Sequence, residues 1–201
     1  VYKRQIKSLC TWAQKTEEVL VVIFRGASPL PPPEGKRQKP HAFVAGADVS
    51  EFVGKDSTTI RPEFEDNVWE AVWKLRKPTI ALIDGYALGG GSELALSCDI
   101  RIATNRSMFG TPEINLGLIP GGGGTQRLTW LVGYGKAMEM VMGGEMIDGE
   151  EAYRIGLVNH IVEPNDLMKK GMEIANNLSS KSPLTIQVAK QAVRAALDNP
   201  I

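Results

Sequence analysis

The chain has few of the residues that support a disulfide framework or a histidine-rich metal site. Its 201 residues include two cysteines, Cys10 and Cys98, which are far apart and form no CxxC pair, and two histidines, His41 and His160. We therefore expect neither disulfide bonds nor a bound metal. This pattern favours a reducing compartment, the cytoplasm or, in a eukaryote, the mitochondrial matrix.

The chain also lacks an excess of charge and any long apolar run. Its 23 basic and 23 acidic side chains cancel, so nothing attracts it as a whole to nucleic acid or to an anionic membrane. No stretch is apolar for long enough to span a bilayer. The 43% hydrophobic content is ordinary for a globular protein, and the length suits one sizeable core. Because the chain starts at Val1 and stops soon after a helical pattern, we expect truncation at both ends.

Apolar runs alternate with helical patterns along the chain. Runs rich in β-branched residues predict strands, and the first of them, 19–24, is predicted to be buried on both faces. Apolar residues at helical spacing, or capping signals, predict the helices between and after them. This alternation predicts an α/β fold with parallel strands. The predicted strands are 19–24, 78–84, 100–103 and 157–162, and the predicted helices are 6–14, 61–76, the part that follows Gly124, 164–178 and 183–197.

The segment GYALGGGSELALSCD places a glutamate close to the start of a helix. Three glycines, Gly89 to Gly91, open this predicted helix, and Glu93 lies in its first turn. A helix N-terminus exposes unpaired N–H groups, and glycine lets a ligand atom approach them closely. An anionic oxygen bound at the Gly90 N–H would thus have a carboxylate nearby. Alternatively, the glycines only permit close packing and Glu93 is solvated.

A second glutamate lies in the segment FGTPEINLGLIPGGGGTQRL. Apolar residues and two prolines surround Glu113, and a carboxyl group in an apolar pocket has a raised pKa, which suits a general acid. The alternative is a capping or surface glutamate. The four glycines at 121–124 lack the Lys-Ser/Thr ending of a phosphate loop, so we interpret them as a structural turn that leads into a helix.

A third segment, Ala45-Gly46-Ala47-Asp48, consists of small residues between a strand and a helix. Such residues can leave a backbone N–H pointing into a cleft, although an ordinary turn has the same composition. Two carboxylates combined with two bare N–H donors would be suited to proton transfer beside a carbonyl whose oxygen becomes negative.

The segments FVAGADVSEF, KPTIALIDGYALGGGSELALSCDIRIAT and FGTPEINLGLIPGGGGTQRL follow one another in this order. The series resembles the crotonase (enoyl-CoA hydratase/isomerase) superfamily, most closely a 2-enoyl-CoA hydratase, over about residues 19–197. The resemblance implies an α/β spiral of ββα units, followed by helices that trimerise. We accordingly expect a spiral core at 1–147, without its N-terminal strands, and the start of a helical region at 148–201.

The resemblance also implies roles for individual residues. The amides of Ala47 and Gly90 would form the oxyanion hole, and Glu93 and Glu113 would be the two catalytic glutamates. The loop Ala45–Asp48, together with the Gly90 amide, would contact coenzyme A, which is part of the substrate, so no separate cofactor is expected. The full-length protein would act in fatty acid β-oxidation as a homotrimer or a dimer of trimers.

Two other functions remain open at this point. An enoyl-CoA isomerase, or an acyl-CoA hydrolase or lyase of the same fold, would need the oxyanion hole and a single glutamate, whereas the presence of both glutamates favours hydration. A non-catalytic RNA-binding relative is disfavoured by the balanced charge and by the lack of a basic stretch with interleaved aromatic residues.

Overall fold

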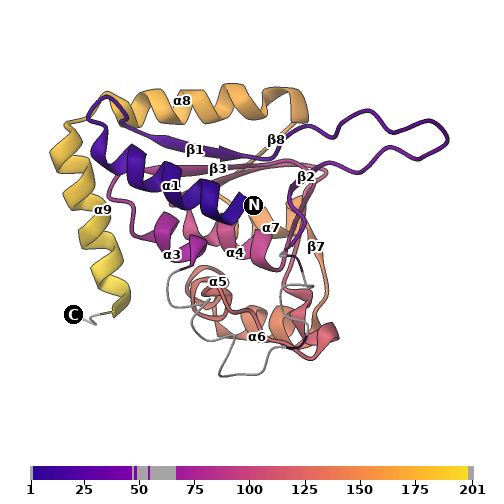
Figure 1. Ribbon diagram of the computed structural model, residues 1–201. Coiled ribbons are helices and arrows are strands. Elements are labelled where there is room, and N and C mark those ends of the chain that lie inside the picture. Colours follow the sequence, from indigo (N-terminus) through magenta and orange to yellow (C-terminus); the bar gives the residue numbers. More distant parts are fainter. Residues whose placement is uncertain (1, 47, 49–53, 55–66, 199–201) are drawn as a thin grey trace.

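The computed structural model of the chain describes residues 2–46, 48, 54 and 67–198. Two small sheets form its centre, and helices cover them (Figure 1). Most strands come in pairs, in which a strand of the first sheet is followed along the chain by a strand of the second and then by a helix. This alternation is the arrangement that the ββα pattern predicts.

The first sheet is parallel and has the order β1-β3-β5-β8. It confirms the strands predicted at 78–84 and 100–103. Of the strand predicted at 157–162, only His160–Val162 form a strand. The strand predicted at 19–24 is shorter, and the prediction that it is buried on both faces is wrong, since its residues are half-buried or exposed. Within the described residues, β1 has a neighbouring strand on one side only, which leaves it at an edge. The strands are β1 (Val22–Arg25), β3 (Thr79–Ile83), β5 (Ile100–Thr104) and β8 (His160–Val162).

The central strand β3 is fully buried because helices cover both faces of the sheet. Ile80 and Leu82 point to one face, where they pack with residues of α8 (Leu167–Ser179). Ala81 and Ile83 alternate with them and join the main core on the other face. There the helices α1 (Tyr2–Lys15), α3 (Val68–Trp73) and α4 (Gly90–Ser97) cover the sheet (Figure 1). A strand with two buried faces needs a continuous apolar run, as this sequence has.

The second sheet has the order β2-β4-β6-β7, with β2, β4 and β6 parallel and β7 antiparallel to β6. Its strands have two or three residues each, too few for an apolar periodicity, so residue patterns alone did not predict them. A tight turn links β3 to β4. The turn contains Gly85 with φ +81°, and a Cβ there would lie 1.9 Å from the His41 carbonyl oxygen. The strands are β2 (Ala42–Val44), β4 (Tyr86–Leu88), β6 (Met108–Gly110) and β7 (Ile147–Asp148).

The remaining helices largely follow the sequence prediction. Of the helix predicted at 61–76, residues 61–66 lie outside the described residues, and α3 covers 68–73. Asp148 caps α7, because its side chain accepts a hydrogen bond from the Glu151 N–H at 2.8 Å. The further helices are η2 (Pro112–Leu116), α5 (Gly124–Val132), α6 (Tyr134–Gly143), α7 (Gly149–Arg154), η3 (Pro164–Asp166) and α9 (Pro183–Asp198).

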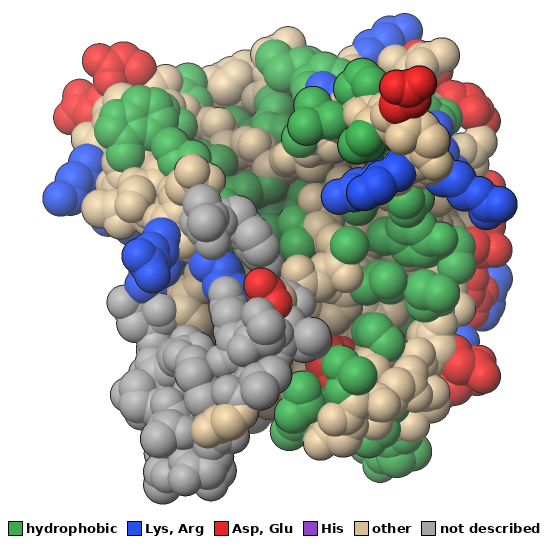
Figure 2. Space-filling model, turned by 45° about the vertical axis from the view of Figure 1, so that its right-hand side comes forward, with side chains coloured by type: hydrophobic (Ala, Val, Ile, Leu, Met, Phe, Trp, Pro, Cys, Tyr) green, Lys and Arg blue, Asp and Glu red, His purple; other side chains and the backbone are tan. Residues whose placement is uncertain are grey.

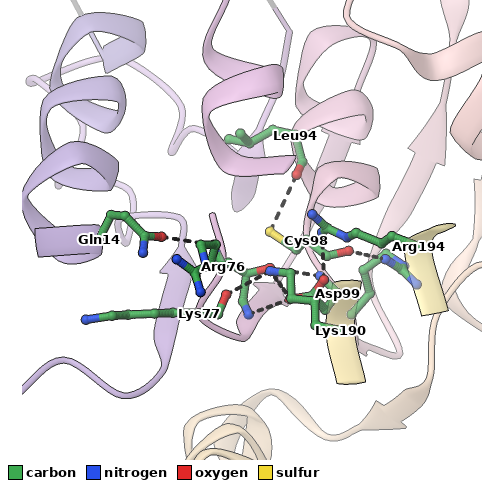
Figure 3. A network of polar contacts seen from close by, with 10 residues as sticks. Gln14, Arg76, Lys77, Leu94, Cys98, Asp99, Lys190 and Arg194 are labelled. Atoms are coloured by element: carbon green, nitrogen blue, oxygen red, sulfur yellow. Dashed lines mark hydrogen bonds and ion pairs between the residues drawn. The ribbon is translucent and has the colours of Figure 1, made fainter. Parts of the chain in front are cut away.

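Asp99 anchors α9 to the body of the molecule (Figure 3). Its carboxylate binds Lys190 at 2.6 Å and Arg194 at 2.7 Å, both from α9. The same carboxylate accepts a hydrogen bond from the Thr79 N–H at 2.8 Å, at the start of β3. Because the Lys190 side chain is 8% exposed, the ion pair between Lys190 and Asp99 is largely shielded from water, and an unpaired charge there would be costly.

A close approach of α4 to β2 gives a test of this packing. A Cβ on Gly91, the second residue of α4, would lie 1.8 Å from the backbone oxygen of Val44. Since backbone atoms cannot give way, we expect Gly91→Ala to lower the free energy of unfolding by about 3 kcal/mol or more. Gly135, the second residue of α6, is a matched control because a Cβ there meets nothing within 4 Å. Urea unfolding should show Gly135→Ala to be near neutral, and equal effects of the two changes would contradict this packing.

Candidate active site

Three of the predicted site segments follow three neighbouring parallel strands. The segment Ala45–Asp48 follows β2, Gly89 and α4 follow β4, and η2 follows β6 shortly after its end. Because the carboxyl ends of parallel strands meet at one edge of a sheet, the three segments lie on the same side of the second sheet. A Cβ on Gly46 would lie 3.7 Å from the Leu88 carbonyl oxygen, which places this loop beside the end of β4.

The oxyanion-hole prediction for Ala47 concerns a residue outside the described ones. Of its neighbours in the same loop, Ala45 and Asp48 are exposed and Gly46 is half-buried. The other predicted donor, the Gly90 N–H, belongs to the first residue of α4, so it has no partner within its own helix. Gly89 precedes it with φ +52°, a conformation that favours glycine.

Glu93 is fully within the protein, with 2% of its surface exposed. The alternative of a solvated Glu93 is therefore wrong. Its Oε1 accepts two backbone hydrogen bonds, from Gly122 N–H at 2.6 Å and from Gly124 N–H at 2.9 Å. A Cβ on Gly124 would lie 2.9 Å from the same oxygen, so glycine at this position lets the backbone reach the carboxylate.

The glycine run at 121–124 thus has a role that sequence reasoning missed. It is a turn that leads into a helix, as predicted, since α5 begins at Gly124. It also supplies both N–H donors that bind Glu93. The signal was present in the sequence, because successive small residues with free N–H groups can form a binding site for an anion, and that anion can be a side chain of the protein itself.

Glu113 lies in η2, directly against the start of α4. A Cβ on Gly89 would lie 2.9 Å from Glu113 Oε1. Its other oxygen, Oε2, is buried and has no hydrogen-bond partner among the described residues. The carboxyl group therefore faces the helix N-terminus that carries Gly90. Glu113 is also half-buried and lies in the first turn of η2, a position that is compatible with the alternative of a capping glutamate.

The environment raises the pKa of both carboxyl groups. Burial raises the pKa of Glu93 to about 7, and the charge of Glu113 adds to this, whereas the two glycine N–H groups and Arg127 oppose it. Burial also raises the pKa of Glu113. Two carboxyl groups that oppose each other's ionisation titrate as a coupled pair, and such a pair can hold one proton near neutral pH. This arrangement can accept a proton at one group and donate one from the other.

Apolar side chains are exposed on η2 and directly after it. Leu116 is 62% exposed and Ile119 is 70% exposed. Figure 2 shows hydrophobic side chains over a broad area of the side that it presents.

Among the described residues, no cluster of three or more histidine, cysteine or acidic side chains is arranged to hold a metal ion. The same residues include no helix with both the length and the apolar character to cross a bilayer.

Comparison with known proteins identifies the family. The profile described as enoyl-CoA hydratase/isomerase matches residues 37–201. The chain belongs to this family. A crystal structure of an enoyl-CoA hydratase from Bacillus anthracis has a TM-score of 0.85 to this chain at 36% identity, and the match covers 98% of this chain and 72% of that one. The predicted α/β crotonase fold is therefore confirmed.

Curated enoyl-CoA hydratases are also similar in sequence. A short-chain-enoyl-CoA hydratase of Clostridium acetobutylicum is 44% identical over 188 residues, which cover 92% of this chain and 67% of that protein. A probable mitochondrial enoyl-CoA hydratase of Dictyostelium discoideum is 44% identical over 160 residues, covering 78% of this chain and 57% of that protein. The matches thus span about three fifths to two thirds of the curated relatives' length.

Because the Glu93 carboxyl group is buried, we expect the substitution Glu93→Gln to raise the free energy of unfolding in a pH-dependent way. The pKa of Glu93 is about 7 in the folded protein against an ordinary value of 4.5, so Glu93 destabilises the folded state progressively from about pH 4.5 to about pH 7, and the loss stays constant above that. At about pH 8, Glu93→Gln should raise the free energy of unfolding by about 1–3 kcal/mol, and at about pH 5 this gain should largely vanish. Urea unfolding at both pH values measures the difference.

Glu139→Gln is the control for this stability measurement. Glu139 pairs with Lys136 on the surface, and its side chain is 66% exposed. We expect this change to be near neutral at both pH values. A gain from Glu93→Gln that is the same at both pH values would contradict the assignment of a raised pKa to Glu93.

Proposed function

We propose that the full-length protein is a 2-enoyl-CoA hydratase, which adds water across the double bond of a trans-2-enoyl-CoA thioester. The observation that carries this proposal is the pair of carboxyl groups with raised pKa, Glu93 and Glu113, beside the N-terminus of α4. An enzyme that moved one proton within its substrate would need one such group, whereas hydration uses one at the water and one at the α-carbon. The enoyl-CoA hydratases among its relatives support the same function.

The substrate carbonyl would bind at the start of α4. Its oxygen becomes negative when the water oxygen adds to the β-carbon, and the Gly90 N–H is a donor at the positive end of a helix dipole. The Ala47 N–H would be the second donor, as the resemblance implies. Loss of one donor of this kind typically costs about 2.7–4 kcal/mol of activation free energy.

The two glutamates would divide the proton transfers. Glu93 is held by two N–H donors, which favour its ionised form, so it would take a proton from water while the water oxygen bonds to the β-carbon. Glu113 has one oxygen without a partner among the described residues, and it would deliver its proton to the α-carbon. In the reverse reaction, dehydration, the roles interchange.

The coenzyme A part of the substrate would contact the loop Ala45–Asp48 and the Gly90 amide, and no separate cofactor or metal would take part. By the same resemblance, the protein would act in fatty acid β-oxidation as a homotrimer or a dimer of trimers. A reducing compartment fits the cysteine content, either the cytoplasm or the mitochondrial matrix. The mitochondrial name of the Dictyostelium discoideum relative is in keeping with the second.

Crotonyl-CoA hydration by the full-length protein tests this function. We expect Glu93→Gln and Glu113→Gln each to lower kcat by about 100-fold or more, because loss of a positioned acid or base typically costs this much. Glu173→Gln is the control, since Glu173 pairs with Lys170 on the surface. Mass analysis separates hydration, which adds water, from isomerisation, which leaves the mass unchanged. Near-normal rates in both site variants, or a product of unchanged mass, would refute the proposal.

The pH dependence of kcat/KM gives a second test, because it reports the ionisation of groups in the free enzyme. Glu93 must be ionised to accept a proton, and its pKa is about 7. The rate should therefore rise with pH through an acid limb centred within about one pH unit of 7. A rate that stays constant from about pH 5 to about pH 9 would show that Glu93 is not the base.

A further inference from the structure

The loop that binds the Glu93 carboxylate is itself bound by the side chain of Arg127. Gly122 donates its N–H to Glu93 at 2.6 Å, and the carbonyl oxygen of the same residue accepts a hydrogen bond from Arg127 Nη1, also at 2.6 Å. A Cβ on Gly123 would lie 2.2 Å from Arg127 Nη1, so the guanidinium lies directly against the loop. One side chain thus fixes the residue that binds the candidate base.

Arg127 is an unusual residue for this place, because it is 5% exposed. Burying a guanidinium is costly unless it is paired, and an apolar residue could fill the space at lower cost. Its charge is compensated by Glu70 of α3, whose Oε1 lies 2.6 Å from Arg127 Nη2. The guanidinium also lies over the ring of Trp73, 4.7 Å from its centroid. The fork of Arg127 therefore joins Gly122 to α3.

The helix α3 also contacts Gly90, the predicted oxyanion-hole residue at the start of α4. Trp69 of α3 donates its Nε1–H to the carbonyl oxygen of Gly90 at 2.7 Å. The Trp69 ring also packs on Gly122, where a Cβ would lie 2.3 Å from the ring. The N-terminus of α3 is fixed in turn, because the Asn67 side chain accepts a hydrogen bond from Glu70 N–H at 2.8 Å. Through Trp69 and Glu70, α3 contacts both Gly90 and the loop that binds Glu93.

We propose that Arg127 is a positioning residue, whose guanidinium, held by Glu70, fixes Gly122 so that the Gly122 N–H orients the Glu93 carboxylate toward the reacting water. This proposal rests on the proposed function, in which Glu93 is the base. Arg127 itself does not touch the substrate in this account. It acts through Gly122, and the planar fork is needed because two acceptors in different segments must be bound at once.

The charge of Arg127 provides a readout that packing alone would not give. Among the described residues, the charged groups with the largest effects on Glu93 are Glu113 on η2, which raises its pKa, and Arg127 on α5, which lowers it. When the positive charge is removed, the opposing effect of Glu113 remains. The pKa of Glu93 should therefore rise, and the acid limb of the rate profile should move to higher pH.

The experiment compares Arg127→Gln and Arg127→Lys in the full-length protein. Arg127→Gln should lower kcat by about 10- to 100-fold, because a displaced catalytic group costs this much, and KM should stay within about twofold. Its acid limb should move to higher pH. Arg127→Lys keeps the charge, so its limb should stay in place, but a single ammonium group cannot reproduce the fork, and kcat should recover only in part.

Arg154→Gln is the matched control. Arg154 also donates from two of its nitrogens, both to the carboxylate of Glu151, but its side chain is 71% exposed. This change should leave kcat, KM and the pH profile unaltered. If Arg127→Gln behaves like this control, or if it lowers stability and activity together with an unmoved acid limb, Arg127 is structural only and the proposal is overturned. If Arg127→Gln does not fold, Arg127→Lys decides, and full kcat in that variant would also overturn it.

A measurement that needs no turnover separates this proposal from the proposed function. A carbon-13 NMR titration of the Glu93 carboxyl group should show a higher pKa in Arg127→Gln than in the unchanged protein, whether or not the protein hydrates crotonyl-CoA. Lack of hydration by the unchanged protein would refute the function alone. An unmoved Glu93 pKa in Arg127→Gln would refute the role of Arg127 alone.

Discussion

The arrangement of the site depends on one buried interaction, the carboxylate of Glu93 bound by the backbone N–H groups of Gly122 and Gly124. A carboxylate buried without partners would be protonated at neutral pH or would destabilise the fold. Two charge-assisted hydrogen bonds offset part of that cost, and they fix the direction of the side chain. Burial still prevails, since the pKa of Glu93 is raised to about 7. The result is a carboxyl group that exchanges a proton in the neutral pH range.

The second sheet explains how distant segments meet around this carboxylate. β2, β4 and β6 are parallel neighbours, so the segments that follow them lie along one edge. The spacing along the edge is then set by close contacts with backbone atoms, such as that of Gly91 with the Val44 carbonyl. Behind the edge, α3 links the Gly90 carbonyl to Gly122 through Trp69, and Arg127 completes the link through Glu70. The site is thus supported by buried polar contacts that join separate segments.

Residue patterns predicted the parts of the fold that are long and uniformly apolar. β3 is buried on both faces, so its sequence is an almost continuous apolar run that is easy to recognise, whereas β5 includes the buried Arg101 among its apolar residues. The strands of the second sheet, such as β4, have two or three residues and carry no such pattern. Their existence follows from pairing with neighbours that are distant in sequence, and only the resemblance to a family implied them.

The main residues of the site were predictable from the sequence, but the contacts that hold these residues in place were not. Glu93 and Glu113 stand in motifs that favour chemistry, and the structure brings both to the start of α4, whereas Ala47 lies outside the described residues. The role of the glycine run 121–124 depends on its contact with Glu93, and that of Arg127 on its pairing with Glu70; both partners are distant in sequence, and local patterns do not encode such contacts.

In the bound complex, one thioester oxygen should meet the Gly90 amide while both glutamates flank the neighbouring carbon–carbon bond. A crystal structure of the full-length protein with an unreactive acyl-CoA analogue measures this directly. The thioester oxygen should lie about 2.7–3.1 Å from the Gly90 nitrogen and from the Ala47 nitrogen, with the Glu93 and Glu113 carboxyl groups beside the α- and β-carbons. An analogue bound with its thioester away from α4, or with either carboxyl group turned away from those carbons, would contradict the account.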